Sequence, residues 1–74
     1  MQIDVRSVRH AQALAQHGSI SRAAAALGIA QPTLSRSIKD LEIRVGLVLF
    51  TRHRHGVQAT DFGHVFLKQA ALVA

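Results

Sequence analysis

The only proline of this chain, Pro32, lies between two helical patterns that almost touch. Apolar residues recur at helical spacing up to Leu27 and again from Gln31 onward, so only Gly28–Ala30 remains to connect them. Proline disrupts a helix interior but suits the first turn, where its missing N–H would be unpaired anyway. The sequence therefore predicts a helix, a tight turn, and a second helix over about residues 31–45 that is set at an angle to the first.

Length and composition allow one small domain. A chain of 74 residues must be compact or associate, because a domain of this size buries only roughly 60% of its unfolded surface. It has no cysteine, which excludes a disulfide framework and a cysteine-based zinc finger. Its 49% hydrophobic residues are too many for a disordered tail, and no apolar run approaches the length of a membrane span. We expect a soluble, cytoplasmic, single-domain protein without a cofactor.

A first helix is expected before this pair. Asp4 is a suitable N-cap, and Gly18 can end the helix in a left-handed conformation. The residues expected on its largely apolar side are Val5, Val8, Ala11 or Gln12, and Ala15, with Leu14 near the edge of that side.

A second helix and a hairpin complete the pattern around the pair. Ser21 can cap a helix over Arg22–Leu27. The short apolar segments Leu47–Phe50 and Val57–Ala59 flank the polar stretch Thr51–Gly56, which indicates a small β-hairpin.

The last segment is expected to form a helix over residues 61–74 that Thr60 caps. This helix is apolar on more than one side, with Phe62, Phe66 and Leu72 spread around it. Three interpretations stay open: it packs on a second copy of itself, it leads into a further part of the protein, or it folds back on the first helix.

The helix over residues 31–45 has two distinct faces. Leu34, Ile38, Leu41 and Val45 fall within about 60° of one another on a helical wheel and should be buried. An adjoining arc toward the N-terminal end is polar and basic. It consists of Gln31, Pro32, Ser35, Arg36 and Lys39.

The net charge of +5 favours a polyanionic partner. The major groove of DNA admits one helix, and the second helix of such a pair enters it with its N-terminal residues at the base edges. Gln31 could bond adenine and Arg36 guanine, while Ser35 could bond a base or a phosphate. The alternative is that these side chains, and the charge as a whole, are only solvated.

The expected hairpin tip carries Arg52, His53, Arg54 and His55, which can lie along a phosphate backbone or reach a minor groove. His53 and His55 are not expected to bind metal, because no cysteine or nearby carboxylate completes a site. The other histidines are expected at the surface or its boundary. They are His10, His17 and His64.

The residues of this pattern resemble the N-terminal domain of LysR-type transcriptional regulators over nearly the whole chain. The resemblance implies a mainly α fold: a winged helix-turn-helix over residues 1–59 with a short β-hairpin wing at about 50–59, and the start of a C-terminal linker helix over 60–74. It rests on the stretches Gly18–Ala24, Gln31–Ile38 and Leu41–Glu42 together with Leu27, Gly46, Leu49, Phe50 and Arg52.

The resemblance also implies a function, which is sequence-specific binding of double-stranded DNA in bacterial-type transcription regulation. It implies a homodimer through the C-terminal helix, a tetramer in the full-length protein, and a small-molecule effector sensed only by a domain that this chain lacks. The implied DNA contacts are Ser21, Arg22, Gln31, Pro32, Thr33, Ser35, Arg36, Lys39, Arg52 and Arg54. Ala30 departs from the family, since a capping serine usually stands there.

Three other function classes fit the sequence less well. A basic amphipathic module could bind a membrane surface, but such a helix needs no capped break at Pro32. An enzyme is disfavoured because no acid–base pair lies in a suggestive motif and so small a domain has little room for a buried pocket. RNA binding is disfavoured because tyrosine and tryptophan are absent and the phenylalanines look like core residues.

Overall fold

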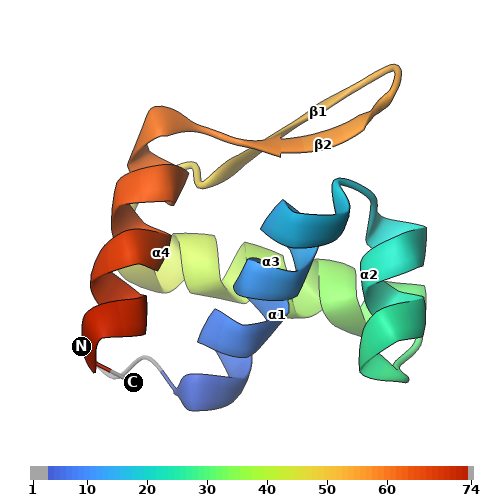
Figure 1. Cartoon of the computed structure of the whole chain (residues 1–74), viewed down its shortest axis with the longest axis horizontal. Coiled ribbons are helices and arrows are strands. Elements are labelled where there is room, and N and C mark those ends of the chain that lie inside the picture. Colours follow the sequence, from blue (N-terminus) through green and yellow to red (C-terminus); the bar gives the residue numbers. More distant parts are fainter. Residues whose placement is uncertain (1–3, 74) are drawn as a thin grey trace.

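The computed structural model describes residues 4–73, so the predicted range ends that fall on residues 1–3 and 74 lie outside it. Four helices and one antiparallel hairpin form a winged helix-turn-helix, as predicted. In Figure 1, α2 and α4 lie at opposite ends, α1 and α3 lie between them, and the hairpin extends over one side. The elements are α1 (Val5–His17), α2 (Ile20–Leu27), α3 (Gln31–Val45), β1 (Phe50–His53), β2 (Gly56–Ala59) and α4 (Asp61–Val73).

Helix α1 begins and ends where the sequence predicts. The Asp4 carboxylate accepts a hydrogen bond of 2.7 Å from the Ser7 N–H, which satisfies one of the unpaired donors of the first turn. Gly18 is left-handed, with φ of +70°, and its N–H donates to the Leu14 carbonyl.

The predicted start of α2 is wrong by two residues. Ser19, not Ser21, is the N-cap, and its hydroxyl accepts a 3.2 Å hydrogen bond from the Arg22 N–H. Both serines are good caps, but Gly18 turns the chain so sharply that Ser19 is already the extended residue before the helix. Ile20 therefore lies in the first turn of α2 and packs against the core.

The predicted apolar side of α1 is only partly right. Val5 is 60% exposed and Ala15 is exposed, whereas His10, Ala11 and Leu14 are buried. Alanines around the helix blur its periodicity, and α2 and α3 pack against the side that carries Leu14. The tertiary contacts therefore choose the buried face.

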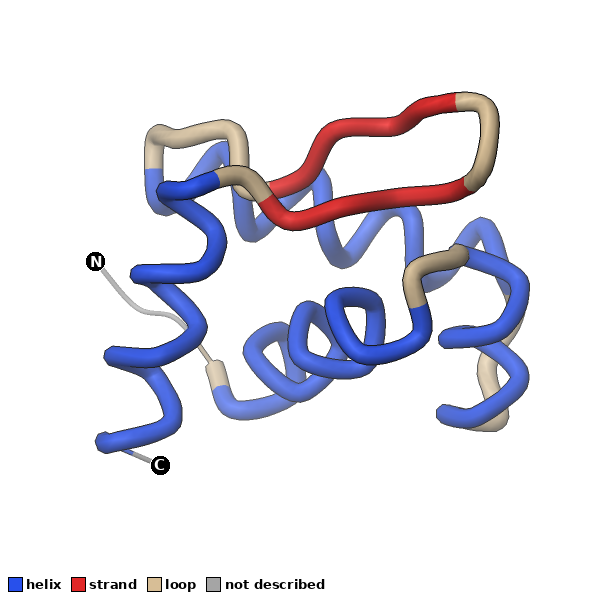
Figure 2. The backbone as a smooth tube through the Cα atoms, turned by 45° about the horizontal axis from the view of Figure 1, so that its top comes forward, coloured by secondary structure: helices blue, strands red, loops and turns tan. Residues whose placement is uncertain are grey.

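The core lies where α1, α2 and α3 meet under the hairpin (Figure 2). The small side chains of Ala23 and Ala24 are buried and let α2 approach closely, as their size suggests. The predicted buried stripe of α3 is confirmed, with Val45 half-buried at its end. The core residues are Ala11, Leu14, Ala23, Ala24, Leu34, Ile38, Leu41, Leu49 and Phe50.

The hairpin is present within the predicted wing at about 50–59, but its first strand begins at Phe50 and not at Leu47. Phe50 pairs with Ala59 and His53 with Gly56, so the turn contains only Arg54 and His55. Val48 is 61% exposed and precedes the first strand. The strand begins at Phe50 because a carboxylate of α3 accepts hydrogen bonds from the backbone there.

Helix α4 is anchored to the base of the hairpin by Thr60. The Thr60 hydroxyl accepts from the Gly63 N–H at 3.0 Å, which confirms the predicted cap, and donates to the Val48 carbonyl at 2.7 Å. Gly63 permits this close approach, because a Cβ there would lie 2.2 Å from the Leu49 carbonyl oxygen.

One side of α4 faces inward and another is uncovered. The helix contacts α1, and Phe66 and Leu67 pack against the core, as expected if it folds back on the first helix. Phe62, Val65 and Leu72 are between 59% and 76% exposed. Folding back therefore covers only part of the apolar surface of α4.

The expectation that His10 lies at the surface or its boundary is wrong. His10 is only 8% exposed, and its Nδ1 shares a 2.7 Å hydrogen bond with the Ser37 hydroxyl of α3. Burial, and then the nearby Arg6 guanidinium, lowers the pKa of His10 below its ordinary value of 6.5.

Because its pKa is lowered on folding, His10 should make the domain less stable in mild acid. The unfolded chain binds a proton at His10 more readily, so stability is retained above about pH 6.5 and is lost as the pH falls below it. Urea unfolding between about pH 5 and pH 8 should show this loss, and His10→Asn should flatten it while keeping a polar partner for Ser37. An unchanged pH dependence in His10→Asn would assign the effect to other groups.

Candidate nucleic-acid interface

The N-terminal end of α3 exposes the polar face that the sequence predicts. Gly28 adopts a left-handed conformation, and the Ile29 N–H donates to the Ala24 carbonyl at 3.0 Å, which closes α2 just before α3 begins. Since Leu34, Ile38 and Leu41 bury the adjoining face, most of the polar side chains face outward. Gln31, Pro32, Thr33, Arg36 and Lys39 are exposed, and Ser35 is half-buried.

The N-terminus of α3 lacks a side-chain cap. Ala30 is the N-cap residue, in an extended conformation, and makes no side-chain hydrogen bond. Pro32 has no N–H, so the donors of the first turn that need an outside partner are those of Gln31 and Thr33. Such donors favour an anion beside the helix start.

Ala30→Ser should stabilise the domain by about 0.5–2 kcal/mol, because a serine oxygen there can accept from the Thr33 N–H. Urea unfolding of the two proteins measures the difference. Ala30→Val is the matched control, since it suits the extended backbone but offers no acceptor. If the serine variant gains no more stability than the valine variant, water already accepts hydrogen bonds from the free N–H groups at the start of α3.

Strand β1 brings Arg52 to the start of α3. An Arg52 Nη2 atom lies 3.5 Å from the Ser35 hydroxyl, at the long limit of a hydrogen bond. These two residues line one shallow groove with Ile20, Gln31 and Pro32. The fold thus joins four of the predicted contact residues that are up to 21 positions apart in the sequence.

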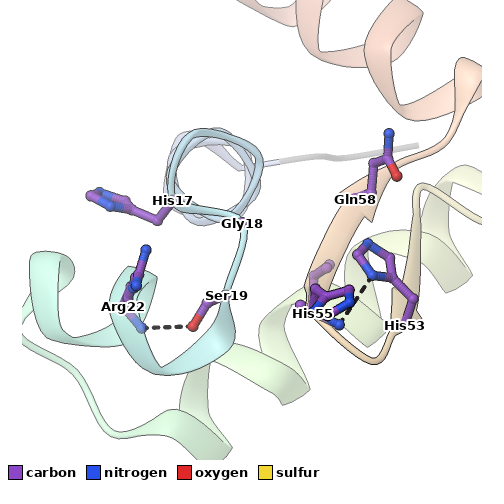
Figure 3. Close-up of a pocket in the computed structure, with 9 residues that line it drawn as sticks. His17, Gly18, Ser19, Arg22, His53, His55 and Gln58 are labelled. Atoms are coloured by element: carbon purple, nitrogen blue, oxygen red, sulfur yellow. Dashed lines mark hydrogen bonds between the residues drawn. The ribbon is translucent and has the colours of Figure 1, made fainter.

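Other predicted contact residues lie in two neighbouring grooves. Arg22 lines a groove between the α1–α2 junction and the hairpin (Figure 3). Thr33 and Arg36 line a groove between the start of α1 and α3. The remaining three are exposed and line none of these grooves. They are Ser21, which is not needed as a cap, Lys39, and Arg54 in the hairpin turn.

Sequence reasoning did not single out Arg6 and Arg44 as part of this surface. Both line the groove with Thr33 and Arg36, where Asp4 and Asp40 balance part of the positive charge. The pKa of Asp4 is lowered first by its hydrogen bond from the Ser7 backbone, with smaller effects of Arg44 and Arg6. The charge pattern contains both arginines, but only the packing of α1 on α3 brings Arg6 beside Arg36.

Glu42 fixes the hairpin relative to α3. One carboxylate oxygen, Oε2, accepts from the Leu49 N–H at 2.8 Å and from the Phe50 N–H at 3.2 Å. Both donors lie where the chain enters β1, so this side chain decides where the strand starts. In the sequence Glu42 contributes to the family resemblance, but no local pattern indicates its contact with the start of β1.

Within residues 4–73, no group of three or more histidine, cysteine or acidic side chains is arranged to hold a metal ion. In the same part of the chain, no helix is long and apolar enough to cross a membrane.

Comparisons with known proteins agree with this geometry. Residues 5–64 match the model of a family described as bacterial regulatory helix-turn-helix protein, lysR family. The chain is 44% identical over 70 residues to the small neutral protease regulatory protein of Streptomyces coelicolor, covering 95% of this chain but only 21% of that relative.

Two solved structures with DNA are also similar. The first is the complex of the BenM DNA-binding domain with benA site 1 DNA, with a TM-score of 0.89 and 37% identity over 96% of this chain and 83% of that one. The second is the complex of the CbnR DNA-binding domain with DNA, with a TM-score of 0.91 and 32% identity over 96% of this chain and 82% of that one.

Proposed function

Since the chain belongs to the lysR family of bacterial regulatory helix-turn-helix proteins, we propose that it reads a specific duplex-DNA site with α3 in the major groove and the β1–β2 wing on the backbone or in the minor groove. The family is one of transcription regulators, not of enzymes. The observation that carries the proposal is the exposed polar start of α3, with Arg52 of the wing beside it.

The contacts divide by chemistry into base reading and positioning. Gln31 and Arg36 can each make two hydrogen bonds to one base, to adenine and guanine respectively. Thr33 and Ser35 can add contacts to a base or a phosphate, and Pro32 can contact a thymine methyl group. The other exposed residues suit phosphates, which fix the orientation of the domain without reading sequence. They are Ser21, Arg22, Lys39, Arg52 and Arg54.

We further propose that residues 1–59 act as the DNA-binding unit and that 60–74 begin a linker helix that pairs two copies. The uncovered apolar face of α4, with Phe62, Val65 and Leu72, supports this pairing. Two copies would place two α3 helices on successive half-sites of the duplex.

We also propose that the whole protein contains a further domain beside this DNA-binding domain. A tetramer and a small-molecule effector would depend on a further domain of the kind that the family carries. The similar full-length CbnR, complexed with its target DNA, is a longer chain of which this one covers 25%, which supports a further domain. A cytoplasmic location follows from the proposed function, because the bacterial chromosome lies there.

Selection of bound sites from random duplex DNA at fixed salt tests the proposal. We expect an interrupted palindrome whose half-sites lie about one helical turn or a multiple of it apart. An affinity that falls steeply with salt should accompany it. Enrichment of a single half-site would contradict the dimer, and no enrichment over random DNA would contradict sequence-specific reading.

A further inference from the structure

The groove between the α1–α2 junction and the hairpin collects histidines that are far apart in the sequence. His17 ends α1, while His53 and His55 come from the end of β1 and the hairpin turn. Figure 3 shows His17 and Arg22 on one side and His53, His55 and Gln58 on the other. All three imidazoles are at least partly exposed, so solvent protons and a ligand can reach them.

The charges around this groove have one sign. Arg22 of α2 supplies a permanent positive charge, and none of the nine lining residues is acidic. The other polar side chains are the neutral Ser19, which caps α2, and Gln58 of β2. Imidazole is the side chain whose charge ordinarily changes between about pH 5 and pH 8. Protonation would therefore turn a groove with one fixed charge into a strongly cationic one.

The two walls of the groove are held together through the backbone. The Val57 N–H donates a 2.8 Å hydrogen bond to the Gly18 carbonyl. Gly56, with φ of +140°, lies so close that a Cβ there would be 2.2 Å from the Gly18 oxygen. The outer end of the hairpin is thus docked on the α1–α2 junction, so the two walls of the groove are joined without a ligand.

The tautomer of His53 also favours an acceptor ligand. Its Nδ1 lies 3.3 Å from the His55 backbone N–H and accepts a hydrogen bond from it. In the neutral ring the proton is then on Nε2, which is free to donate. His53 can therefore donate to an anion even when neutral, whereas protonation of His17 and His55 adds charge.

We propose that this groove binds a phosphate of the DNA backbone, and that protonation of His17 and His55 strengthens the binding. The inference rests on the proposed function, since the phosphate belongs to the duplex that α3 reads. It adds His17, His53 and His55 to Arg22 and makes the affinity for DNA depend on pH.

DNA affinity should rise roughly tenfold from about pH 8 to about pH 6, since exposed charge pairs each change affinity a few-fold. The plot of log affinity against log salt should also be steeper at the lower pH, by about one for each further phosphate that the domain neutralises. Fluorescence anisotropy with the selected duplex, at fixed chloride and in one buffer mixture, measures both. Circular dichroism at each pH checks that the chain remains folded despite the titration of His10.

The decisive variant combines His17→Gln, His53→Asn and His55→Gln, where the asparagine oxygen keeps an acceptor for the His55 backbone. It should bind somewhat more weakly than the unmodified chain at about pH 8, because it lacks the donor of the neutral His53 ring, and it should lose most of the rise in affinity at about pH 6. His64→Gln is the matched control, because His64 is an exposed histidine of α4 outside the groove, and it should keep the full rise.

The outcomes separate this inference from the proposed function. If no duplex is bound at either pH, the proposed function fails. If the duplex is bound but the triple variant keeps the full pH dependence, only the inference fails. Titration with inorganic phosphate, followed by NMR of the imidazole protons, tests the other source of this ligand. Shifts with phosphate but not with duplex would make the groove a site for the free anion and overturn the assignment to DNA.

Discussion

Replacing Glu42 by alanine is expected to lower the free energy of unfolding by about 2–4 kcal/mol. Its carboxylate accepts two backbone hydrogen bonds, from Leu49 and Phe50, and both of these residues are buried. A hydrogen bond to a charged group contributes about 1.5–3 kcal/mol, and a buried N–H left without a partner adds a cost. Because the Glu42 side chain is only half-buried, we expect the total loss to stay below the sum of the largest values of these contributions. Urea unfolding measures the loss.

The matched control is Glu42→Gln, which keeps an oxygen acceptor but loses the charge. It should lower the free energy of unfolding clearly less than Glu42→Ala does, because it keeps neutral hydrogen bonds that are about half as strong as the charged ones. The amide NMR signals of β1 should shift in the alanine variant and remain close to their original positions in the glutamine variant. A loss under about 0.5 kcal/mol in Glu42→Ala would show that this side chain does not set the start of the hairpin.

Arg36→Ala is expected to weaken binding to the selected duplex about 5- to 150-fold, the equivalent of about 1–3 kcal/mol for one good bidentate contact with a base. Arg36 is exposed on the polar face of α3, where its guanidinium can reach a guanine edge. Binding to random duplex should fall much less, because only the phosphate contacts matter there. Anisotropy titrations with both duplexes at one salt concentration measure the two losses.

Arg9→Ala controls for the loss of one positive charge, since Arg9 is exposed on α1 and lines none of the three grooves. It should lower both affinities slightly and equally. If Arg36→Ala lowers the affinities for specific and random duplex by the same factor, Arg36 contacts a phosphate. Another residue of α3 must then read the base.

Local signals predicted the helix-turn-helix because each depends on a few neighbouring residues. The left-handed Gly18, Gly28 and Gly46 end three helices, and Asp4 and Thr60 cap the starts of α1 and α4. In α3 the apolar residues Leu34, Ile38, Leu41 and Val45 recur on one side, and Ile43, which is 70% exposed, is the exception. This helical period allowed the exposed face of α3 to be predicted. The exposure of the candidate contact residues followed from that pattern.

Local sequence signals predicted the wrong cap or the wrong buried residues where two alternatives fitted the pattern equally well. Ser19 and Ser21 are both suitable caps, and the alanines of α1 fit more than one buried side. The start of β1 depends on Glu42, whose contact with Leu49 spans seven residues and has no recognisable local motif. The burial of His10 depends on Ser37, which is 27 residues away.

The sequence by itself determined the elements of this protein and the polar face of α3, because caps, glycines and helical period act within a few residues. Only the tertiary structure decided what lies beside that face. Arg52 joins Gln31 and Ser35 because Glu42 fixes the base of the wing. His53 and His55 join His17 and Arg22 because Gly56 docks the wing tip on Gly18. Such neighbours depend on contacts between residues distant in the chain, which no local pattern encodes.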